Sequence, residues 1–407
     1  MKTVAVISEF NPFHSGHAHL FDEIRRAFDE PVAVICIMSG NFVQRGEAAI
    51  VRKQVRAEAA LLGGCDLVLE LPFPYSSAAA ERFARAGVHI ANSLGCVDVL
   101  AFGAECADTE KLTRLAECLE STEFRDAYFK ADASLGSAEK TEAVYRSLYG
   151  DDGRLPLLLQ PNTLLGVEYI RALISSKSNI KPLAIQRTGA EHDAPMPTDF
   201  AMHPSGKSLR EAFENGDEDA FSRLPLHSAE LIKNEVSERK SVADNNLLME
   251  YILMHYRLCD DTQIAEADGM AGGLFSRIQH AAREASNGHD FFSRLKTKKY
   301  TDAFLRRALL TGVFGITREM LNTLPAYTQV LAMNECGRGI LNKVRKTTAI
   351  PLLTKPADFT ELPQNAKEQA ALSVRADSLY CALFRAPLSP ADMMRYFPVC
   401  KNSENLG

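Results

Sequence analysis

Two histidines and a glycine near the amino terminus have the types and the spacing of a phosphate-binding turn. They lie in residues 11–17 (NPFHSGH), between an apolar run and an amphipathic one. Imidazole N–H groups donate to phosphate oxygens without a permanent charge, glycine lets the backbone approach the ligand, and a helix start adds free N–H donors. The pattern matches neither the lysine-bearing P-loop nor the G-x-G-x-x-G fingerprint. It predicts a nucleotide site, and the alternative is a pair of histidines that pack or cap a helix.

Strands that alternate with helices are expected to position this turn. Apolar runs and helical periodicity predict strands over 3–8, 31–38, 66–71, 97–102 and 180–187, and helices over 18–28, 78–94 and 162–174. Such alternation indicates βαβ units and a doubly wound, Rossmann-like parallel sheet. The turn would then lie at the carboxyl edge of the sheet, where ligands bind in α/β folds.

The second half of the chain has a different pattern. From residue 228 onward apolar residues recur at helical spacing, as in Leu247, Leu248, Tyr251 and Ile252, and strand signals are few. The sequence therefore predicts an α/β protein with two domains. Residues 1–225 would form a nucleotide-binding domain, and residues 226–407 a mostly α-helical domain.

Composition limits the class of protein. With 407 residues, at least two domains are expected, and 46% hydrophobic residues fit a globular protein. The formal net charge of -6 means that any RNA contact needs a local basic surface. No run approaches the roughly 20 apolar residues of a membrane span, and the first residues predict a strand in place of a signal peptide. The 9 cysteines include no C-x-x-C pair, so we expect reduced thiols, no zinc site and a cytoplasmic protein.

Longer motifs narrow the family. The H-x-G-H turn resembles the signature of the nucleotidyltransferase superfamily, whose members bind ATP and promote attack on its α-phosphate. Together with residues 38–47 (MSGNFVQRGE) it closely resembles the bacterial tRNA(Met) cytidine acetate ligases. The resemblance continues through residues 66–75 (DLVLELPFPY), 102–105 (FGAE), 161–166 (PNTLLG) and 186–187 (QR). It covers the chain well to about Arg210 and the helical half more loosely.

The resemblance implies a two-step ligase. ATP and acetate would give acetyl-adenylate and pyrophosphate, and the acetyl group would pass to N4 of the wobble cytidine of elongator tRNA(Met). Attack at the α-phosphate needs positioning and charge neutralisation. We expect ATP as a substrate, tRNA(Met) and acetate as partners, no DNA and no membrane. Mg²⁺ would accompany the phosphates, although no acidic cluster marks its ligands. A small-molecule adenylyltransferase and a non-enzymatic nucleotide-binding or RNA-binding module remain alternatives.

The resemblance also implies site residues. Those expected to act in catalysis are His14, His17, Arg45, Ser205 and Arg210. Those expected to bind ATP are Ile7, Ser8, Glu9, Phe10, Asn11, Pro12, Phe13, His14, Ser15, Gly16, His17, Ala18, His19, Leu20, Gly103, Asn162, Gln186 and Arg187. From spacing alone, Asn162 fits a plain helix cap, Ser205 a capped polar loop, and Arg45 a solvated loop arginine.

Basic residues in the second half give the candidate tRNA contacts. One stretch holds Arg294, Lys296, Lys298, Lys299, Arg306 and Arg307, with Asp302 as its only acid, and a second holds Arg338, Lys343, Arg345 and Lys346. We predict that Lys296, Lys298, Lys299 and Arg307 contact the tRNA, and the alternative is a solvated basic helix face. Residues 303–305 (AFL) replace a Ser-Arg-Ile segment of the family and remove an arginine.

Overall fold

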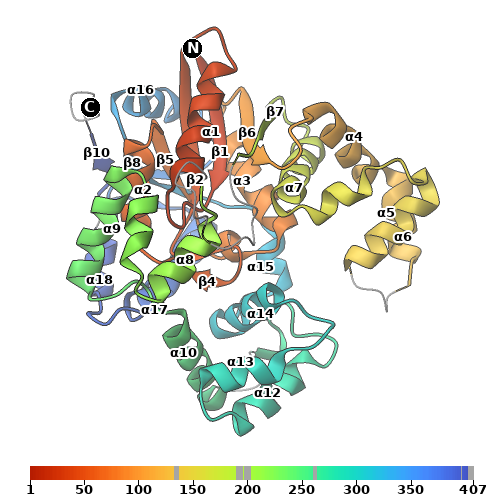
Figure 1. Ribbon diagram of the computed structural model, residues 1–407, viewed down its shortest axis with the longest axis vertical. Coiled ribbons are helices and arrows are strands. Elements are labelled where there is room, and N and C mark those ends of the chain that lie inside the picture. Colours follow the sequence, from red (N-terminus) through yellow and green to blue (C-terminus); the bar gives the residue numbers. More distant parts are fainter. Residues whose placement is uncertain (133–136, 189–195, 197–202, 260–263, 396, 402–407) are drawn as a thin grey trace.

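A mixed sheet forms the centre of the molecule. The computed structural model describes residues 1–132, 137–188, 196, 203–259, 264–395 and 397–401 (Figure 1). Five strands run parallel in the order β5-β2-β1-β6-β7. Their bounds are β1 (Lys2–Ser8), β2 (Val32–Ser39), β5 (Leu67–Leu71), β6 (Val99–Ala104) and β7 (Lys181–Gln186). The predicted parallel α/β sheet is confirmed, with each predicted strand displaced by at most two residues at either end.

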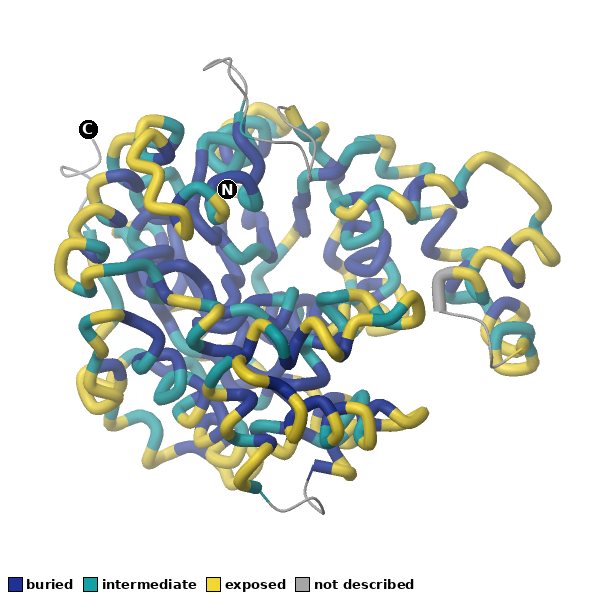
Figure 2. Tube along the Cα trace, turned by 60° about the horizontal axis from the view of Figure 1, so that its bottom comes forward, coloured by how far each residue is buried: buried dark blue, intermediate teal, exposed yellow. Residues whose placement is uncertain are grey.

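Helices cover both faces of this sheet, which explains its near-continuous apolar strands. In β1, Val4 and Val6 face one core, while Ala5 and Ile7 face the other. The first core is closed by α1 (Ser15–Arg26) and α2 (Lys53–Leu62). The second is closed by α3 (Ala80–Leu94), α4 (Thr109–Glu120), α7 (Pro161–Ser175) and α16 (Glu335–Val344). Strands β1, β2, β5 and β6 are mostly buried, as the dark blue centre of Figure 2 shows, whereas the outer strand β7 is only partly covered.

The second half is mostly helical, as the sequence predicts, and has its own core. The bundle consists of α10 (Asn245–Leu258), α12 (Leu274–Glu284), α13 (Gly288–Leu295) and α14 (Asp302–Phe314), at the bottom of Figure 1, with α17 (Gln364–Cys381) against it. Phe42 and Phe73, from the first half, lie in the same core. The two halves therefore share buried side chains.

Three short strands in the second half were not predicted. Strand β8 (Thr328–Met333) pairs antiparallel with β5, and β10 (Val399–Cys400) and β9 (Leu352–Leu353) pair with β8. The second half is still mostly helical as predicted, but the six-residue run TQVLAM forms a strand that its local sequence does not indicate. This run is buried because it covers the edge that β5 would otherwise expose.

The remaining elements lie around these two cores. Helices α5 (Thr122–Lys130) and α6 (Ser137–Tyr149) project at the right of Figure 1. The others are β3 (Phe42–Val43), β4 (Glu47–Ala48), α8 (Gly206–Glu214), α9 (Leu226–Arg239), α15 (Arg318–Asn322), α18 (Pro390–Met394) and 3₁₀ turns at Tyr75–Ser77, Leu155–Leu159, Glu218–Arg223 and Pro356–Glu361. In the described part of the chain, no helix has the length and apolar character that crossing a bilayer requires.

Candidate active site

A cavity of about 260 Å³ lies at the carboxyl ends of β1, β6 and β7, beside the start of α1. This is the edge at which α/β sheets bind ligands. Most of the predicted residues line it: Ile7, Ser8, Glu9, Phe10, Asn11, Pro12, His14, Gly16, His17, His19, Leu20, Arg45, Gly103, Asn162, Gln186, Arg187 and Arg210. Phe13, Ser15, Ala18 and Ser205 lie outside the lining. Phe13 packs in the core behind the turn, and Ser15 hydrogen-bonds to His203.

His14 and His17 each bind a backbone N–H through Nδ1. Nδ1 of His14 accepts from the Gly16 N–H (3.1 Å), and Nδ1 of His17 accepts from the His14 N–H (3.2 Å). An accepting Nδ1 is unprotonated, so the proton of each neutral ring is on Nε2. The ring centroids are 3.8 Å apart. The start of α1 thus presents two Nε2–H donors side by side.

Burial keeps these rings neutral. It lowers the pKa of His14 well below its usual value, and the neighbouring His17 and Arg187 lower it further. Burial and Arg187 lower the pKa of His17 to about 3. Two adjacent uncharged donors suit a ligand that brings its own negative charge, because they need no counter-ion before it binds.

The wall formed by β6 and α7 is held together by Glu105. Its Oε1 accepts from the Asn162 side-chain amide (2.6 Å), and its Oε2 accepts from the Thr163 backbone N–H (2.7 Å). Burial alone would raise the pKa of Glu105, but these hydrogen bonds lower it. The cap residue of α7 is Gln160, so the interpretation of Asn162 as a plain helix cap is wrong.

Asn162 and Gly103 both contact Arg187. The Arg187 guanidinium donates to Oδ1 of Asn162 at 3.5 Å. A Cβ at Gly103 would lie 3.2 Å from Cγ of Arg187, so glycine leaves this side chain room beside the strand. Arg187 follows β7 directly, and burial lowers its pKa. These contacts fix one cation against the cavity.

Helix α8 closes the side next to the histidine turn. Ser205 is the cap residue, and its hydroxyl accepts from the Ser208 N–H (3.1 Å). Arg210, one turn later, donates to the backbone carbonyl of Asn11 (3.0 Å). The capped polar loop that spacing suggests for Ser205 therefore exists, and it brings Arg210 to the cavity.

The chain is similar to known proteins along most of its length. A family model described as HIGH Nucleotidyl Transferase matches residues 1–393. The tRNA(Met) cytidine acetate ligase of Caldanaerobacter subterraneus subsp. tengcongensis is 34% identical over 367 residues, covering 88% of this chain and 90% of the relative. The ligase of the same name from Anoxybacillus flavithermus is 33% identical, with 98% of both chains covered. This chain belongs to the tRNA(Met) cytidine acetate ligase family.

Solved structures agree with this family assignment. The crystal structure of Thermotoga maritima TmcAL bound with alpha-thio ATP matches with a TM-score of 0.91 at 28% identity, covering 99% of this chain and all of that one. The apo form of the same protein gives a TM-score of 0.92 at 29% identity. The whole chain therefore shares its fold with a solved protein, and that protein binds an ATP analogue.

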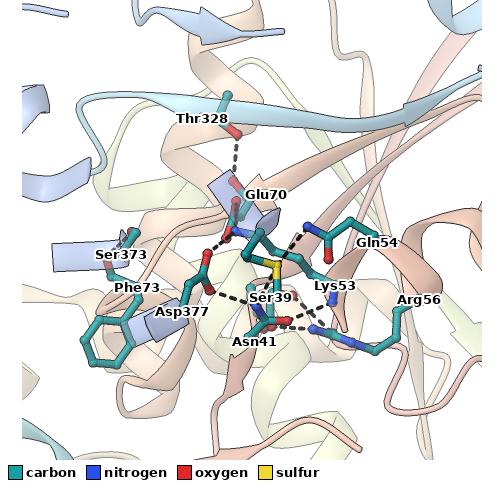
Figure 3. Close-up of polar contacts among 12 residues, drawn as sticks. Ser39, Asn41, Lys53, Gln54, Arg56, Glu70, Phe73, Thr328, Ser373 and Asp377 are labelled. Carbon is teal, nitrogen blue, oxygen red and sulfur yellow. Dashed lines mark hydrogen bonds and ion pairs between the residues drawn. The ribbon is translucent and has the colours of Figure 1, made fainter. Parts of the chain in front are cut away.

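A buried polar network around Lys53 and Arg56 was not predicted. Nζ of Lys53 on α2 lies 2.8 Å from both Glu70 on β5 and Asp377 on α17 (Figure 3). Next to it, Arg56 donates to the carbonyl oxygens of Glu9 (2.6 Å), Ser39 and Gly40. This network fixes the loop after β2 against both halves of this family member. No local sequence pattern marks it.

The predicted tRNA contacts lie in two different environments. Lys296, Lys298 and Lys299 are exposed, although Lys296 pairs with Asp302 (2.9 Å). Arg307 is partly buried instead, and its guanidinium donates to the carbonyl of Gln44 (3.1 Å). Burial lowers the pKa of Arg307 to about 10. Arg307 thus holds the β3–β4 hairpin, and the three lysines are the more exposed of the four predicted contacts.

The second basic group lies away from the cavity. Arg338, Lys343, Arg345 and Lys346 lie on α16 or just after it. Because β8 runs antiparallel to β5, α16 begins at the amino ends of the parallel strands, whereas the cavity lies at their carboxyl ends. This group is therefore poorly placed to bind the same RNA segment that reaches the cavity.

Proposed function

We propose that this chain is an ATP-dependent tRNA(Met) cytidine acetate ligase of the cytoplasm. It would join acetate to ATP, with release of pyrophosphate, and then acetylate N4 of the wobble cytidine of elongator tRNA(Met). The paired Nε2–H donors of His14 and His17 carry this proposal, because they open a helix onto a cavity in a chain that aligns almost end to end with ligases of that name.

In the first step an acetate oxygen would attack the α-phosphate in line. This reaction needs no protein nucleophile, because the barrier falls when the reactants are held in place and the developing charge is neutralised. We assign charge neutralisation to His14 and His17, and to the cavity cations Arg45, Arg187 and Arg210. Ser205 would act through its helix, by holding Arg210 at the cavity.

Residues 7, 8 and 10–20, with Gly103, Asn162, Gln186 and Arg187, would bind the nucleotide, and most of them line the cavity. The described residues contain no group of three or more His, Cys, Asp or Glu side chains that could hold a metal ion. We therefore assign no protein ligands to Mg²⁺, and expect it to enter with the ATP phosphates. Lys296, Lys298 and Lys299 are the surface that we assign to the tRNA backbone.

The experiment combines the purified chain, ATP, radiolabelled acetate and an unmodified elongator tRNA(Met) transcript. We expect label in the RNA as N4-acetylcytidine, and its loss in His17→Ala. Pyrophosphate release with other carboxylates or phosphates, but no labelled RNA, would instead support a small-molecule adenylyltransferase. ATP binding without any turnover would support a non-enzymatic module.

A further inference from the structure

Glu9 is the one carboxylate among the described residues that line the cavity. It follows β1 directly, and its side chain is mostly buried but keeps some exposure. A carboxylate repels phosphate oxygens, so this position is unsuited to holding a triphosphate by itself. We therefore expect a role for the Glu9 carboxylate other than binding phosphate.

The Glu9 carboxylate is held in place from the β3–β4 hairpin. Its Oε1 accepts from the Gln44 N–H at 2.8 Å, and its backbone carbonyl accepts from Arg56 at 2.6 Å. Arg307 of α14 in turn donates to the Gln44 carbonyl. Thus Glu9 is fixed through Gln44 to the helical bundle, on which the exposed lysines also lie.

Charged groups from three elements face Glu9, along with one tyrosine. Burial raises the pKa of Glu9, whereas the hydrogen bond from Gln44 and the guanidinium groups of Arg210, Arg56 and Arg45 lower it, with a net rise. Glu9 also influences Tyr169 of α7, because burial and the charge of Glu9 raise the pKa of that tyrosine. A carboxyl group with a raised pKa is a stronger base than a solvated one.

The two steps of the proposed function differ in proton balance. Attack of acetate on ATP releases no proton, whereas acylation of an amine does. In the second step N4 attacks the acyl carbon, the bond from that carbon to the phosphate oxygen breaks, and AMP leaves with the electron pair. One proton of N4 must go to an acceptor. His14 and His17 are poor acceptors, because their Nδ1 atoms are already bonded to backbone N–H groups and Nε2 carries the proton.

We propose that Glu9 is the general base that accepts the N4 proton of the acceptor cytidine, and then passes it to solvent. This proposal rests on the proposed function, because it requires an amine acceptor. It places the nucleophile of the second step on the hairpin side of the cavity, next to Gln44.

Glu9→Gln tests the proposal, because it keeps the size of the side chain and removes its basicity. We expect acetate-dependent ATP–pyrophosphate exchange to stay within about threefold of the wild type. Single-turnover transfer of acetyl to the tRNA transcript should fall roughly 100-fold or more, which is typical for loss of a general base. The wild-type transfer rate should rise with pH through the pKa of Glu9, and this limb should disappear in the variant.

Two further variants complete the test. Glu9→Asp keeps a carboxylate and should recover part of the transfer rate. Glu23→Gln removes an acid on α1 that pairs with Arg26 outside the cavity, and should leave both steps unchanged.

Transfer at the wild-type rate in Glu9→Gln would overturn the proposal, and so would equal losses in exchange and transfer. If the wild type shows no acetate-dependent exchange, the proposed function itself fails and the role of Glu9 falls with it. Thermal unfolding and ATP binding of each variant, measured in parallel, separate a chemical defect from a folding defect.

Discussion

At the scale of single residues, the neutral histidines of the turn make stability depend on pH. In the unfolded chain each imidazole takes up a proton near pH 6.5, but in the folded chain burial holds both pKa values far below that. The unfolded state therefore binds more protons as the pH falls below 6.5. The free energy of unfolding should decrease from pH 7 toward pH 4, by at most about 1.4 kcal/mol per pH unit for each histidine.

Urea denaturation at several pH values measures this effect. In His17→Asn the position no longer titrates, so its unfolding free energy should fall less steeply with decreasing pH than that of the wild type. The matched control is His280→Asn, at an exposed position of α12, which should keep the wild-type slope. Equal slopes for all three proteins would contradict the burial of a neutral His17.

The buried ion pairs of Lys53 should contribute strongly to stability. Lys53→Met leaves Glu70 and Asp377 buried without their shared cation. Removing one partner of a buried ion pair typically costs about 3–5 kcal/mol, so we expect the urea midpoint to fall accordingly. The triple variant Lys53→Met/Glu70→Gln/Asp377→Asn should recover part of that loss. A single variant within 1 kcal/mol of the wild type would contradict this account.

The sequence could mark some of these residues and not others. Residues 11–17 are contiguous and hold two histidines around a glycine, so this local pattern alone indicates a site. Asn162 could be assigned only through a family resemblance, whereas Gly103 and Arg187 also stand at the carboxyl ends of predicted strands. Lys53 and Asp377 are 324 positions apart, and their pairing depends on how α17 packs against α2. Arg307 is partly buried against Gln44, and a run of basic residues does not show which of its side chains turns inward.

At the level of whole elements, the helix cap of α8 should affect both protein stability and ATP binding, and the two effects can be measured separately. Ser205→Ala removes the hydroxyl that accepts from Ser208 and should cost about 1 kcal/mol of stability. It should also weaken ATP binding, because α8 carries Arg210 to the Asn11 carbonyl. Thermal unfolding and ATP titration measure the two effects.

A second serine cap supplies the control. Ser121 caps α5 and accepts from the Phe124 N–H at 3.0 Å, outside the cavity. Ser121→Ala should cost a similar amount of stability and leave ATP binding unchanged. If both variants bind ATP like the wild type, α8 does not position a nucleotide ligand.

Elements differed in how well local sequence predicts them. The five parallel strands are apolar on both faces, and helices with turn residues separate them. The apolar runs and the intervening helical pattern therefore predict the same strands. Strand β8 has only six residues between helices α15 and α16, and its strand state depends on the edge of β5, which is distant in sequence. The two-residue strands β3 and β4 depend on the turn at Gly46, which has φ of 73° and lies against the backbone of Arg306 and Arg307.

For the molecule as a whole, the division into two domains after residue 225 stays a prediction. The central sheet argues against independent folding of the first part, because one of its strands comes from the second part. Residues 1–225 alone would lack β8 and would expose Phe42 and Phe73, which pack in the helical core. An uncovered strand edge and exposed aromatics favour aggregation. We therefore expect the 1–225 fragment to be insoluble or unfolded, as measured by soluble yield and far-ultraviolet circular dichroism.

Residues 1–401 are the control for this truncation, because they keep every described element, and they should fold like the full chain. A soluble 1–225 fragment that binds ATP would contradict the prediction. It would show that the nucleotide-binding half is an independent folding unit.

The antiparallel strand β8 also affects how the protein folds during its synthesis. Its residues leave the ribosome more than 250 positions after β5 is made. At about 5–20 residues per second, the edge of β5 waits roughly 10 to 50 s for its partner. During that interval the nascent chain carries an open strand that could pair with a neighbouring nascent chain. Synthesis of this protein should therefore depend on chaperones that bind nascent chains, and slower translation should increase that dependence.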